Sequence, residues 1–342
     1  MSINLITAIN KLGYGTVGRK VLKGLIDKNI RVSLFPIGNV GFEENESKYV
    51  EEGLANATNY NPKDPTLKIW HQFDMSMSIA KGPKYGWPIF EMDRLTPKEE
   101  EELSSVRLIN CSEWAREVCL KHGINSQVVP LGVDTDIFSP KPMPDKFTVF
   151  NCGKLEVRKG HDIIPDIINK AFPDGGIKLI MCWTNPFLDK QFHSEYESYY
   201  RKMMPDVEIV FQDRLNEQRD ISRLINSSNC GLFPYRSEGW NLEGLEALAC
   251  GRHLICTNYS GSTEYTSMMK TVVDPDGLCI AYDGIWFKGQ GKWANIDNKI
   301  DEFAKHLQSC VGSGINQWGV DRAKMFTWDN TVRKLLEVIH VS

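Results

Sequence analysis

The stretch that decides the fold is GLFPYRSEGWNLEGLEALACG, residues 231–251. It begins with an apolar run typical of a buried strand, passes through a short polar turn that contains Glu238 and Gly239, and ends in residues with helical apolar spacing. The first turn of such a helix presents unpaired backbone N–H groups that bind anions, and Glu238 beside it can accept hydrogen bonds from hydroxyl groups. A sugar linked to a diphosphate has both kinds of group, so the stretch predicts a sugar-nucleotide site.

The spacing of Glu238 and Glu246 is weak evidence by itself. A first-turn carboxylate favoured by the helix dipole, followed by a solvated glutamate, gives the same pattern. The longer segment SEGWNLEGLEALACGRHLICTNYSGSTEY, residues 237–265, closely resembles the nucleotide-sugar site of the group 1 glycosyltransferases of family 4. That resemblance implies the α/β architecture called GT-B, with two doubly wound Rossmann-like domains facing a central cleft.

The resemblance also implies roles for individual residues. Glu238 would contact hydroxyl groups of the donor sugar, and Glu246 would hold the ribose. The backbone amides that would approach the phosphates belong to Gly239, Trp240, Asn241 and Leu242. Trp240, Asn241 and Glu243 replace the residues usual in the family, so the identity of the sugar stays open.

Length and composition limit the class of protein. The 342 residues suggest two domains, and 42% apolar with 25% charged residues is typical of a soluble globular protein. No apolar run approaches the roughly 20 residues that span a bilayer, and the N-terminus lacks a signal-peptide pattern, so we expect a cytoplasmic protein. The net charge of −4 gives no long-range attraction to nucleic acid or anionic lipid, although it is compatible with a local basic face.

Cysteine and aspartate patterns argue against a metal site. Nine scattered cysteines, none in a Cys-x-x-Cys pair, predict a reducing compartment and no zinc site. Asp134-Thr135-Asp136 matches the metal motif of another glycosyltransferase architecture, but it begins a proline-rich linker, and the resemblance implies no metal role there. We therefore expect no metal and no cofactor besides the nucleotide-sugar substrate.

The domain organisation follows from strands that alternate with helices on both sides of this linker. We expect residues 1–142 to form an N-terminal Rossmann-like acceptor domain and residues 143–318 to form a C-terminal Rossmann-like donor domain. Residues 319–342 are expected to form a C-terminal helix, which in GT-B proteins crosses back to the first domain.

A glycine motif near the N-terminus supports a rival hypothesis. Gly13, Gly15 and Gly18 match the dinucleotide-binding pattern in its usual place, after a strand and at the start of a helix. That pattern also requires an acidic residue about 20 positions on, whereas the second strand ends in Ile37, Gly38 and Asn39. The glycines therefore indicate a close-approach loop, and the resemblance implies that Gly15 lies against the donor phosphate. For Gly13 and Gly18, a tight turn or close helix packing explains the residues equally well.

His71 is the candidate catalytic residue of the N-terminal half. Residues 67–73, LKIWHQF, predict a buried strand that ends in polar residues, and such ends line the ligand crevice of parallel sheets. On the residues alone, packing and catalysis stay open for a lone histidine. In the family, a histidine after this strand meets the donor sugar near the reacting carbon. Glu91 is a further, weaker candidate for facing the acceptor.

A basic loop is expected after the first strand of the second domain. Lys154, Arg158 and Lys159 lie between that strand, residues 147–152, and a helix expected near Gly160. Each cation alone would be read as solvated, but three on one loop can anchor a diphosphate and stabilise it as it departs. In the family, an arginine and a lysine at this spacing grip the phosphates; Lys159 matches the lysine, and Lys154 replaces the arginine.

The combined prediction is a retaining, metal-independent hexosyl- or pentosyltransferase that uses a UDP- or GDP-linked sugar. Its catalytic residues would be His71, Glu238 and Lys159. Two alternatives stay open, an NAD-dependent oxidoreductase and a non-catalytic sugar-nucleotide-binding module. The acceptor can be a glycan, a lipid-linked glycan, a small molecule, a protein or a modified DNA base, and the oligomeric state is open. Trp286 and Trp293 favour packing over sugar stacking.

Overall fold

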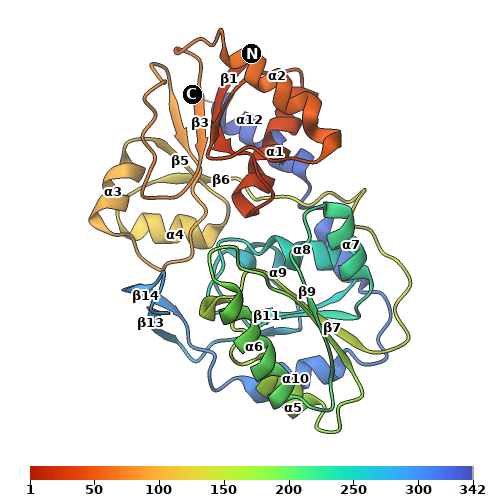
Figure 1. The fold of residues 1–342 in the computed structure, drawn as a ribbon. Helices are drawn as coiled ribbons and strands as arrows, with labels where there is room; N and C mark the ends of the chain where they lie inside the picture. The colour runs from red at the N-terminus through yellow and green to blue at the C-terminus, as the bar shows by residue number, and fades with distance from the viewer. Residues whose placement is uncertain (341–342) are drawn as a thin grey trace. The chain divides into compact units, whose positions relative to one another are not determined.

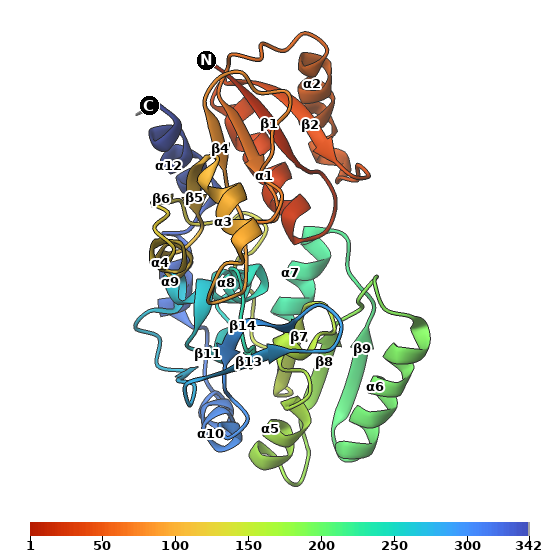
Figure 2. The same ribbon diagram turned by 90° about the vertical axis from the view of Figure 1, so that its left-hand side faces the viewer.

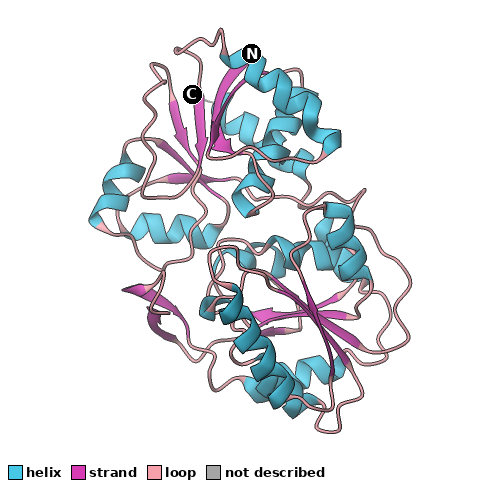
Figure 3. Ribbon diagram, in the orientation of Figure 1, coloured by secondary structure: helices cyan, strands magenta, loops and turns pink. Residues whose placement is uncertain are grey.

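The computed structural model describes residues 1–340, and its internal contacts divide the chain into two compact units (Figure 1). Unit 1 contains Met1–Gly132 together with Phe326–Ser342, and unit 2 contains Val133–Met325. Figure 3 shows that each unit is built from a sheet with helices on both of its sides.

Unit 1 is organised around a six-stranded sheet in which every described pairing is parallel. The strand order is β2-β1-β3-β4-β5-β6. The strands are β1 Ser2–Ala8, β2 Arg31–Ile37, β3 Thr66–Ile69, β4 Lys84–Gly86, β5 Arg107–Asn110 and β6 Ser126–Val128. The helices are α1 Gly13–Asp27, the 3₁₀ turn η1 Glu44–Glu46, α2 Ser47–Ala57, α3 Pro97–Ser104, α4 Glu113–Lys121 and α12 Trp328–His340.

Helix α12 completes unit 1 although it follows all of unit 2 in the chain. It packs against α1, and a Cβ on Gly24 would lie only 2.5 Å from Cγ2 of Val332, so glycine allows the close approach. Val332 and Leu335 are fully buried. In both ribbon views α12, drawn in blue, lies beside the red and orange elements of unit 1 (Figures 1 and 2).

Unit 2 repeats the parallel architecture with the strand order β12-β11-β10-β7-β8-β9. Its strands are β7 Thr148–Cys152, β8 Lys178–Cys182, β9 Glu208–Gln212, β10 Cys230–Phe233, β11 His253–Thr257 and β12 Val272–Val273. Its helical elements are η2 Val157–Lys159, α5 Ile164–Ala171, α6 Lys190–Met203, α7 Gln218–Asn226, α8 Leu242–Ala249, η3 Ser260–Ser262, α9 Thr263–Thr266, α10 Ile300–Ser309 and α11 Gln317–Ala323. A separate antiparallel pair joins β13 Leu278–Tyr282 to β14 Lys288–Ala294. Every residue of β7 and β10 is buried, as expected for strands covered on both faces.

The two sheets confirm the predicted class of two doubly wound, Rossmann-like domains. In each sheet the strand order reverses at one point, between β1 and β3 in unit 1 and between β7 and β10 in unit 2. Ligands of open α/β sheets bind outside the carboxyl ends of the strands at such a point. A ligand-binding site is therefore expected at the loops after β1 and β3 and at those after β7 and β10.

The unit boundaries differ from the predicted residues 142/143 and 318/319. Residues 133–142 belong to unit 2, because Asn226 and the buried Arg252 hold the linker there. Residues 319–325 also belong to unit 2, because α11 packs against α8.

Two predictions of local structure also differ from the structure in their residue positions. Strand β3 ends at Ile69, so His71 follows the strand instead of ending it. The helix expected near Gly160 begins at Ile164, because Gly160 adopts a left-handed conformation (φ 72°) that ends the turn η2.

Candidate functional site

The start of α8 forms the centre of the candidate site. Asn241 adopts a left-handed conformation (φ 65°) and begins the helix, where its Oδ1 accepts a hydrogen bond of 3.2 Å from the N–H of Gly244. The hydroxyl of Tyr265 donates to the carbonyl oxygen of Asn241 at 2.8 Å. Among the described residues, the buried Nδ2 of Asn241 has no hydrogen-bond partner. A buried amide donor beside a helix N-terminus is suited to binding an acceptor-rich ligand such as a phosphate or a sugar.

Glu238 lies between two cations. Its Oε1 is 2.7 Å from Nζ of Lys159, and its Oε2 is 3.1 Å from Nη1 of Arg158. All three side chains are at most 10% exposed, so the charges interact where little water screens them. Arg158 also donates to the carbonyl oxygen of Ser237 at 2.6 Å and to Glu156 at 2.9 Å. The basic loop and the polar turn predicted from sequence therefore meet in one buried cluster.

The charges of this cluster reinforce one another. Burial opposes ionisation of Glu238, but Lys159 and Arg158 outweigh it and lower the pKa of the carboxyl. Burial likewise opposes the charged form of Lys159, and the carboxylates of Glu238 and Glu243 overcome this effect and raise its pKa. Arg158, Lys159 and Glu238 therefore stay ionised near neutral pH and carry a net charge of one positive unit.

The chain after the turn fixes the backbone of Glu238. Its N–H donates to Oγ of Ser260 at 2.8 Å, and its carbonyl oxygen accepts from the N–H of Gly261 at 2.9 Å. Ser260 holds a left-handed conformation (φ 63°), and a Cβ on Gly261 would lie 1.9 Å from the carbonyl oxygen of Gly239. Residues Ser260–Ser262 therefore hold the polar turn at Glu238 and Gly239 in place.

A buried histidine, which the sequence analysis did not select, holds the basic loop. His161 accepts a hydrogen bond from the N–H of Glu156 at Nδ1 (3.2 Å), and its Nε2 lies 2.9 Å from Oδ1 of Asn151 on β7. Burial and the charge of Lys159 lower the pKa of His161 to about 4. The only sequence signal was its position directly after Gly160.

Lys154 lies on the same loop but has a different partner. Its Nζ is 2.9 Å from Oε1 of Glu156 and 5.3 Å from the centre of the Phe187 ring, and its side chain is 36% exposed. Arg158 takes the buried position next to Glu238, although only its neighbour Lys159 and Lys154 were predicted to bind the donor. Because single surface cations are usually solvated, nothing in the sequence set Arg158 apart.

Glu246 is the second predicted carboxylate, and it is buried on α8. The pKa of Cys152, at the carboxyl end of β7, is raised by its neighbour Cys182, then by burial, and further by Glu243 and Glu246. Both carboxylates belong to α8, which packs against β10. Trp240 is also buried, and its ring packs 5.4 Å from that of Tyr265. Most of the predicted donor-binding residues therefore gather at the carboxyl ends of β7 and β10.

Gly15 and His71 belong to unit 1, where they also lie at the point of strand reversal. The His71 ring stacks on Phe73 at 5.1 Å with an angle of 7° between the planes, and it contacts Tyr14 at 4.7 Å. A Cβ on Gly15 would lie 2.2 Å from the carbonyl oxygen of Asn10, so the turn itself requires glycine there. The aromatic packing and this close approach give structural reasons for both residues, and their roles toward a donor stay predictions.

Tyr14, which contacts His71, has further partners in unit 1. The hydroxyl of Tyr14 donates to the carbonyl oxygen of Ile89 at 2.5 Å. Burial raises the pKa of Tyr14, and the nearby Glu91 raises it further. The role of Glu91 toward an acceptor stays a prediction.

Several expectations from the sequence concern metals and membranes. Asp134 accepts a hydrogen bond from the N–H of Asp136 within a turn. Within residues 1–340, no group of three or more His, Cys, Asp or Glu side chains is arranged to hold a metal ion. In the same described range, no helix is both long enough and apolar enough to cross a bilayer.

The two tryptophans of the ribbon β13–β14 differ. Trp293 is 2% exposed and packs 5.5 Å from the Phe287 ring, as predicted. Trp286 is 50% exposed and its ring lies 5.9 Å from that of Phe187, so it packs on one side only.

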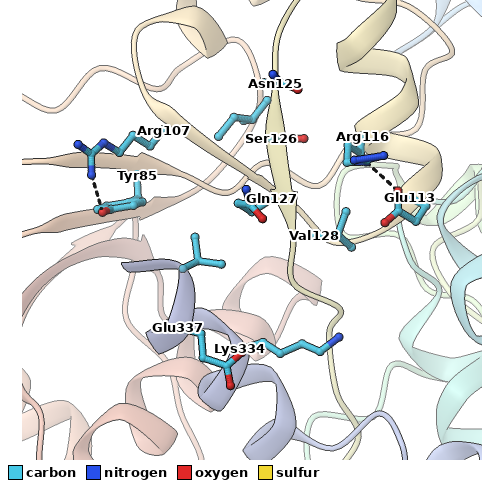
Figure 4. Close-up of a pocket in the computed structure, with 12 residues that line it drawn as sticks. Tyr85, Arg107, Glu113, Arg116, Asn125, Ser126, Gln127, Val128, Lys334 and Glu337 are labelled. Atoms are coloured by element: carbon cyan, nitrogen blue, oxygen red, sulfur yellow. Dashed lines mark hydrogen bonds and ion pairs between the residues drawn. The ribbon is translucent and has the colours of Figure 1, made fainter. Parts of the chain in front are cut away.

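Unit 1 also has a hollow of about 970 Å³ between β6 and α12 (Figure 4). Two of its cationic side chains have partners within the lining: Arg116 pairs with Glu113 at 2.8 Å, and Arg107 donates to the hydroxyl of Tyr85 at 3.1 Å. None of the described residues that line it was predicted as a site residue.

Two Rossmann-like units, each with one strand reversal, are the architecture of the GT-B class. A model of the family described as "Glycosyl transferases group 1" matches residues 146–283, which contain this site. This segment therefore matches the group 1 glycosyltransferase family, in agreement with the resemblance found in the sequence.

A curated relative supports the same family. It is the GDP-mannose-dependent alpha-(1-6)-phosphatidylinositol dimannoside mannosyltransferase of Mycobacterium tuberculosis, 26% identical over 230 residues. That alignment covers 63% of this chain and 52% of the relative, so the chain spans about half the length of the curated relative it matches.

Solved structures share the fold over the whole chain. Sucrose-phosphate synthase from Thermosynechococcus elongatus has a TM-score of 0.72 at 14% identity and is covered to 98% of its length. The Anabaena protein HepE, solved with UDP and glucose, has a TM-score of 0.69 at 12% identity and is covered to 99%. In both comparisons all of this chain is covered. None of the relatives named here is an oxidoreductase, so the dinucleotide hypothesis has no support among them.

Proposed function

We propose that the protein transfers a sugar from a UDP- or GDP-linked donor to an acceptor hydroxyl with retention of configuration and without a metal ion. The observation that carries the proposal is the buried cluster of Glu238, Arg158 and Lys159 at the start of α8. The match of residues 146–283 to the group 1 glycosyltransferases supports a nucleotide-sugar donor. The curated relative uses GDP-mannose, and HepE was solved with UDP, so both nucleotides need testing.

The chemistry assigns the protein a role in positioning and charge stabilisation. The acceptor oxygen attacks the anomeric carbon while the bond to the diphosphate oxygen breaks on the same face, and the departing phosphate takes the acceptor proton. Lys159, Arg158 and the N–H groups at the start of α8 supply positive charge and hydrogen bonds where negative charge develops on the leaving group. Fixed cations of this kind stabilise a departing diphosphate, which is the reason to propose that no metal is needed.

We assign the remaining roles from the family pattern. Glu238 holds the donor sugar, Glu246 holds the ribose, and Gly239, Trp240, Asn241 and Leu242 line the phosphates. The unpartnered Nδ2 of Asn241 supports its part in this set. His71 is proposed to meet the sugar near the reacting carbon, with Gly15 and Lys154 beside the phosphates.

The test is a screen of UDP- and GDP-sugars for enzyme-dependent release of free nucleotide, with EDTA present. We expect release from one donor at a rate that EDTA leaves unchanged. Lys159→Ala should lower this rate about 100-fold or more, because it removes a cation beside the leaving group. Lys170→Ala is the control, since Lys170 is exposed and pairs with the exposed Asp301.

The other outcomes of the screen are equally informative. Loss of activity with EDTA would overturn the metal-free mechanism. Tight donor binding without release or transfer to any acceptor would identify a non-catalytic binding module. Unchanged turnover in a folded Lys159→Ala variant would remove the phosphate role of this loop.

A further inference from the structure

The ribbon formed by β13 and β14 exposes an unusually apolar face. In β13, Ala281 is fully buried, whereas Leu278, Ile280 and Tyr282 are 44%, 66% and 63% exposed. A half-buried antiparallel pair normally turns a polar face to water. The outer face of this ribbon is instead apolar at three successive outward-facing positions.

Lysines stand opposite two of these apolar residues on the same outer face. Ile280 pairs with Lys292, and Tyr282 pairs with Lys288, whereas Leu278 pairs with Ala294. Between residues 278 and 294, Asp283 is the only acidic residue. Its Oδ1 accepts hydrogen bonds of 2.8, 2.8 and 2.9 Å from the N–H groups of the next turn, at Ile285, Trp286 and Phe287. The one negative charge of the ribbon is thereby held against the backbone.

The tip of the ribbon extends the same surface. Ile285 and Trp286 are exposed, and the Trp286 ring lies 5.9 Å from the exposed ring of Phe187, which precedes α6. We call this set the ribbon patch. It consists of Phe187, Leu278, Ile280, Tyr282, Ile285 and Trp286, flanked by Lys288 and Lys292.

The end of β14 fixes the ribbon to unit 2. Trp293 is buried, and Ala294 belongs to the core of the unit. The N–H of Ala294 donates to the carbonyl oxygen of Arg236 at 2.8 Å, only two residues before Glu238. The ribbon that carries the patch is therefore fixed to unit 2, and the patch is exposed in the folded unit.

We propose that the ribbon patch docks on an anionic lipid surface. Contiguous exposed apolar side chains mark interaction sites. Tryptophan and tyrosine favour the boundary between lipid and water, aliphatic side chains enter the acyl region, and lysines attract anionic headgroups. The overall charge of −4 gives no such attraction, so the cations beside the patch supply it locally. This inference stands independently of the proposed transfer reaction.

Two other partners fit the chemistry less well. Single-stranded nucleic acid would stack on Tyr282 and Trp286, but it has no use for the aliphatic Leu278, Ile280 and Ile285. A second copy of the chain would bring the lysines of two identical patches together, which opposes association.

The experiment is flotation of the purified protein with vesicles of phosphatidylcholine alone and of phosphatidylcholine with 30% phosphatidylglycerol, at low and high salt. We expect binding to the anionic vesicles that weakens with salt. The double variant Ile280→Ser, Trp286→Ser should bind these vesicles at least about tenfold more weakly, because two buried apolar side chains are lost. Lys288→Glu, Lys292→Glu should lose binding to a similar degree, about tenfold.

The chain offers a matched control. Ile315→Ser, Trp318→Ser removes the same two residue types at exposed positions outside the patch, and it should bind as the wild type does. No binding to anionic vesicles, or undiminished binding of the Ile280→Ser, Trp286→Ser variant, would overturn the proposal. It would also be overturned by single-stranded DNA binding or self-association through the patch in the absence of vesicle binding.

Discussion

At the scale of single residues, the site depends on charges that compensate one another away from water. Removing one partner of a buried ion pair leaves the other uncompensated, which costs about 3–5 kcal/mol. Glu238 has two cationic partners, so the loss of one leaves the other in place. Single substitutions in this cluster are therefore expected to affect the reaction more than the fold.

Glu246 is expected to act on nucleotide affinity. Glu246→Ala should raise the dissociation constant for UDP or GDP about tenfold, because a hydrogen bond to a charged group contributes roughly 1.5–3 kcal/mol. Turnover at saturating donor should change less. Calorimetric titration measures the affinity, and Glu302→Ala, at a partly exposed position on α10, is the control. A nucleotide affinity equal to that of the wild type would show that Glu246 does not hold the ribose.

His161 predicts a specific dependence of stability on pH. Its pKa is about 4 in the folded chain and 6.5 without burial. Between these values the unfolded chain takes up a proton that the folded chain excludes, so stability falls as the pH drops from 6.5 toward 4. From pH 7 to pH 5 this single group should lower the free energy of unfolding by about 2 kcal/mol.

The measurement is urea unfolding of the wild type and of His161→Gln at both pH values. Glutamine keeps a donor and an acceptor but does not titrate in this range. The variant should therefore lose about 2 kcal/mol less than the wild type on acidification. Equal losses would mean that His161 is protonated in the folded chain.

At the scale of elements, the loop between β7 and α5 is the part that places the cations. A Cβ on Gly160 would lie 1.8 Å from the carbonyl oxygen of Pro234, which follows β10. Gly153, at the other end of the loop, has φ 135° and lies against the side chain of Lys159. Gly160 therefore allows the basic loop to contact the loop after β10, and Gly153 leaves room for the side chain of Lys159.

Gly160→Ala should therefore destabilise the fold by about 3 kcal/mol or more, because the strain of an alanine in the left-handed conformation adds to its steric clash with Pro234. Gly312 has the same φ of 72° and open space around it, so Gly312→Ala isolates the strain, about 1–2 kcal/mol. Thermal unfolding of the two variants gives the comparison. Equal shifts in melting temperature would show that the loop yields to the added methyl group.

Elements also show what the sequence could predict and what it could not. The strand predicted at 147–152 and the apolar run that begins the stretch 231–251 correspond to β7 and β10. A serine directly before an amphipathic run predicts a helix cap, and Ser112 caps α4 in this way. The cap at Asn241 was not predicted, because a left-handed asparagine there depends on Tyr265, which is distant in sequence. His161 was missed, and the place of Arg158 beside Glu238 was not predicted, for a related reason: their partners come from elements that sequence spacing does not relate.

At the scale of the whole molecule, each unit has its own core. Leu335 on α12 is fully buried in unit 1, and Leu248 on α8 is fully buried in unit 2. Leu335→Ala should cost about 2–5 kcal/mol and should speed hydrogen exchange in α1 while leaving α8 unchanged. Leu248→Ala should give the reverse pattern. Mass spectrometry of exchanged peptides distinguishes these results, and faster exchange in both units with either variant would contradict separate cores.

The return of α12 to unit 1 sets an order for folding during synthesis. On the ribosome, N-terminal domains ordinarily finish first. Here the residues from Val133 to Met325 emerge completely before α12 does, so unit 2 can close while unit 1 still lacks its last helix. Until α12 is synthesised, the N-terminal sheet of the nascent chain stays incomplete, with one side of α1 uncovered. A pause in translation before residue 326 would prolong its need for a chaperone.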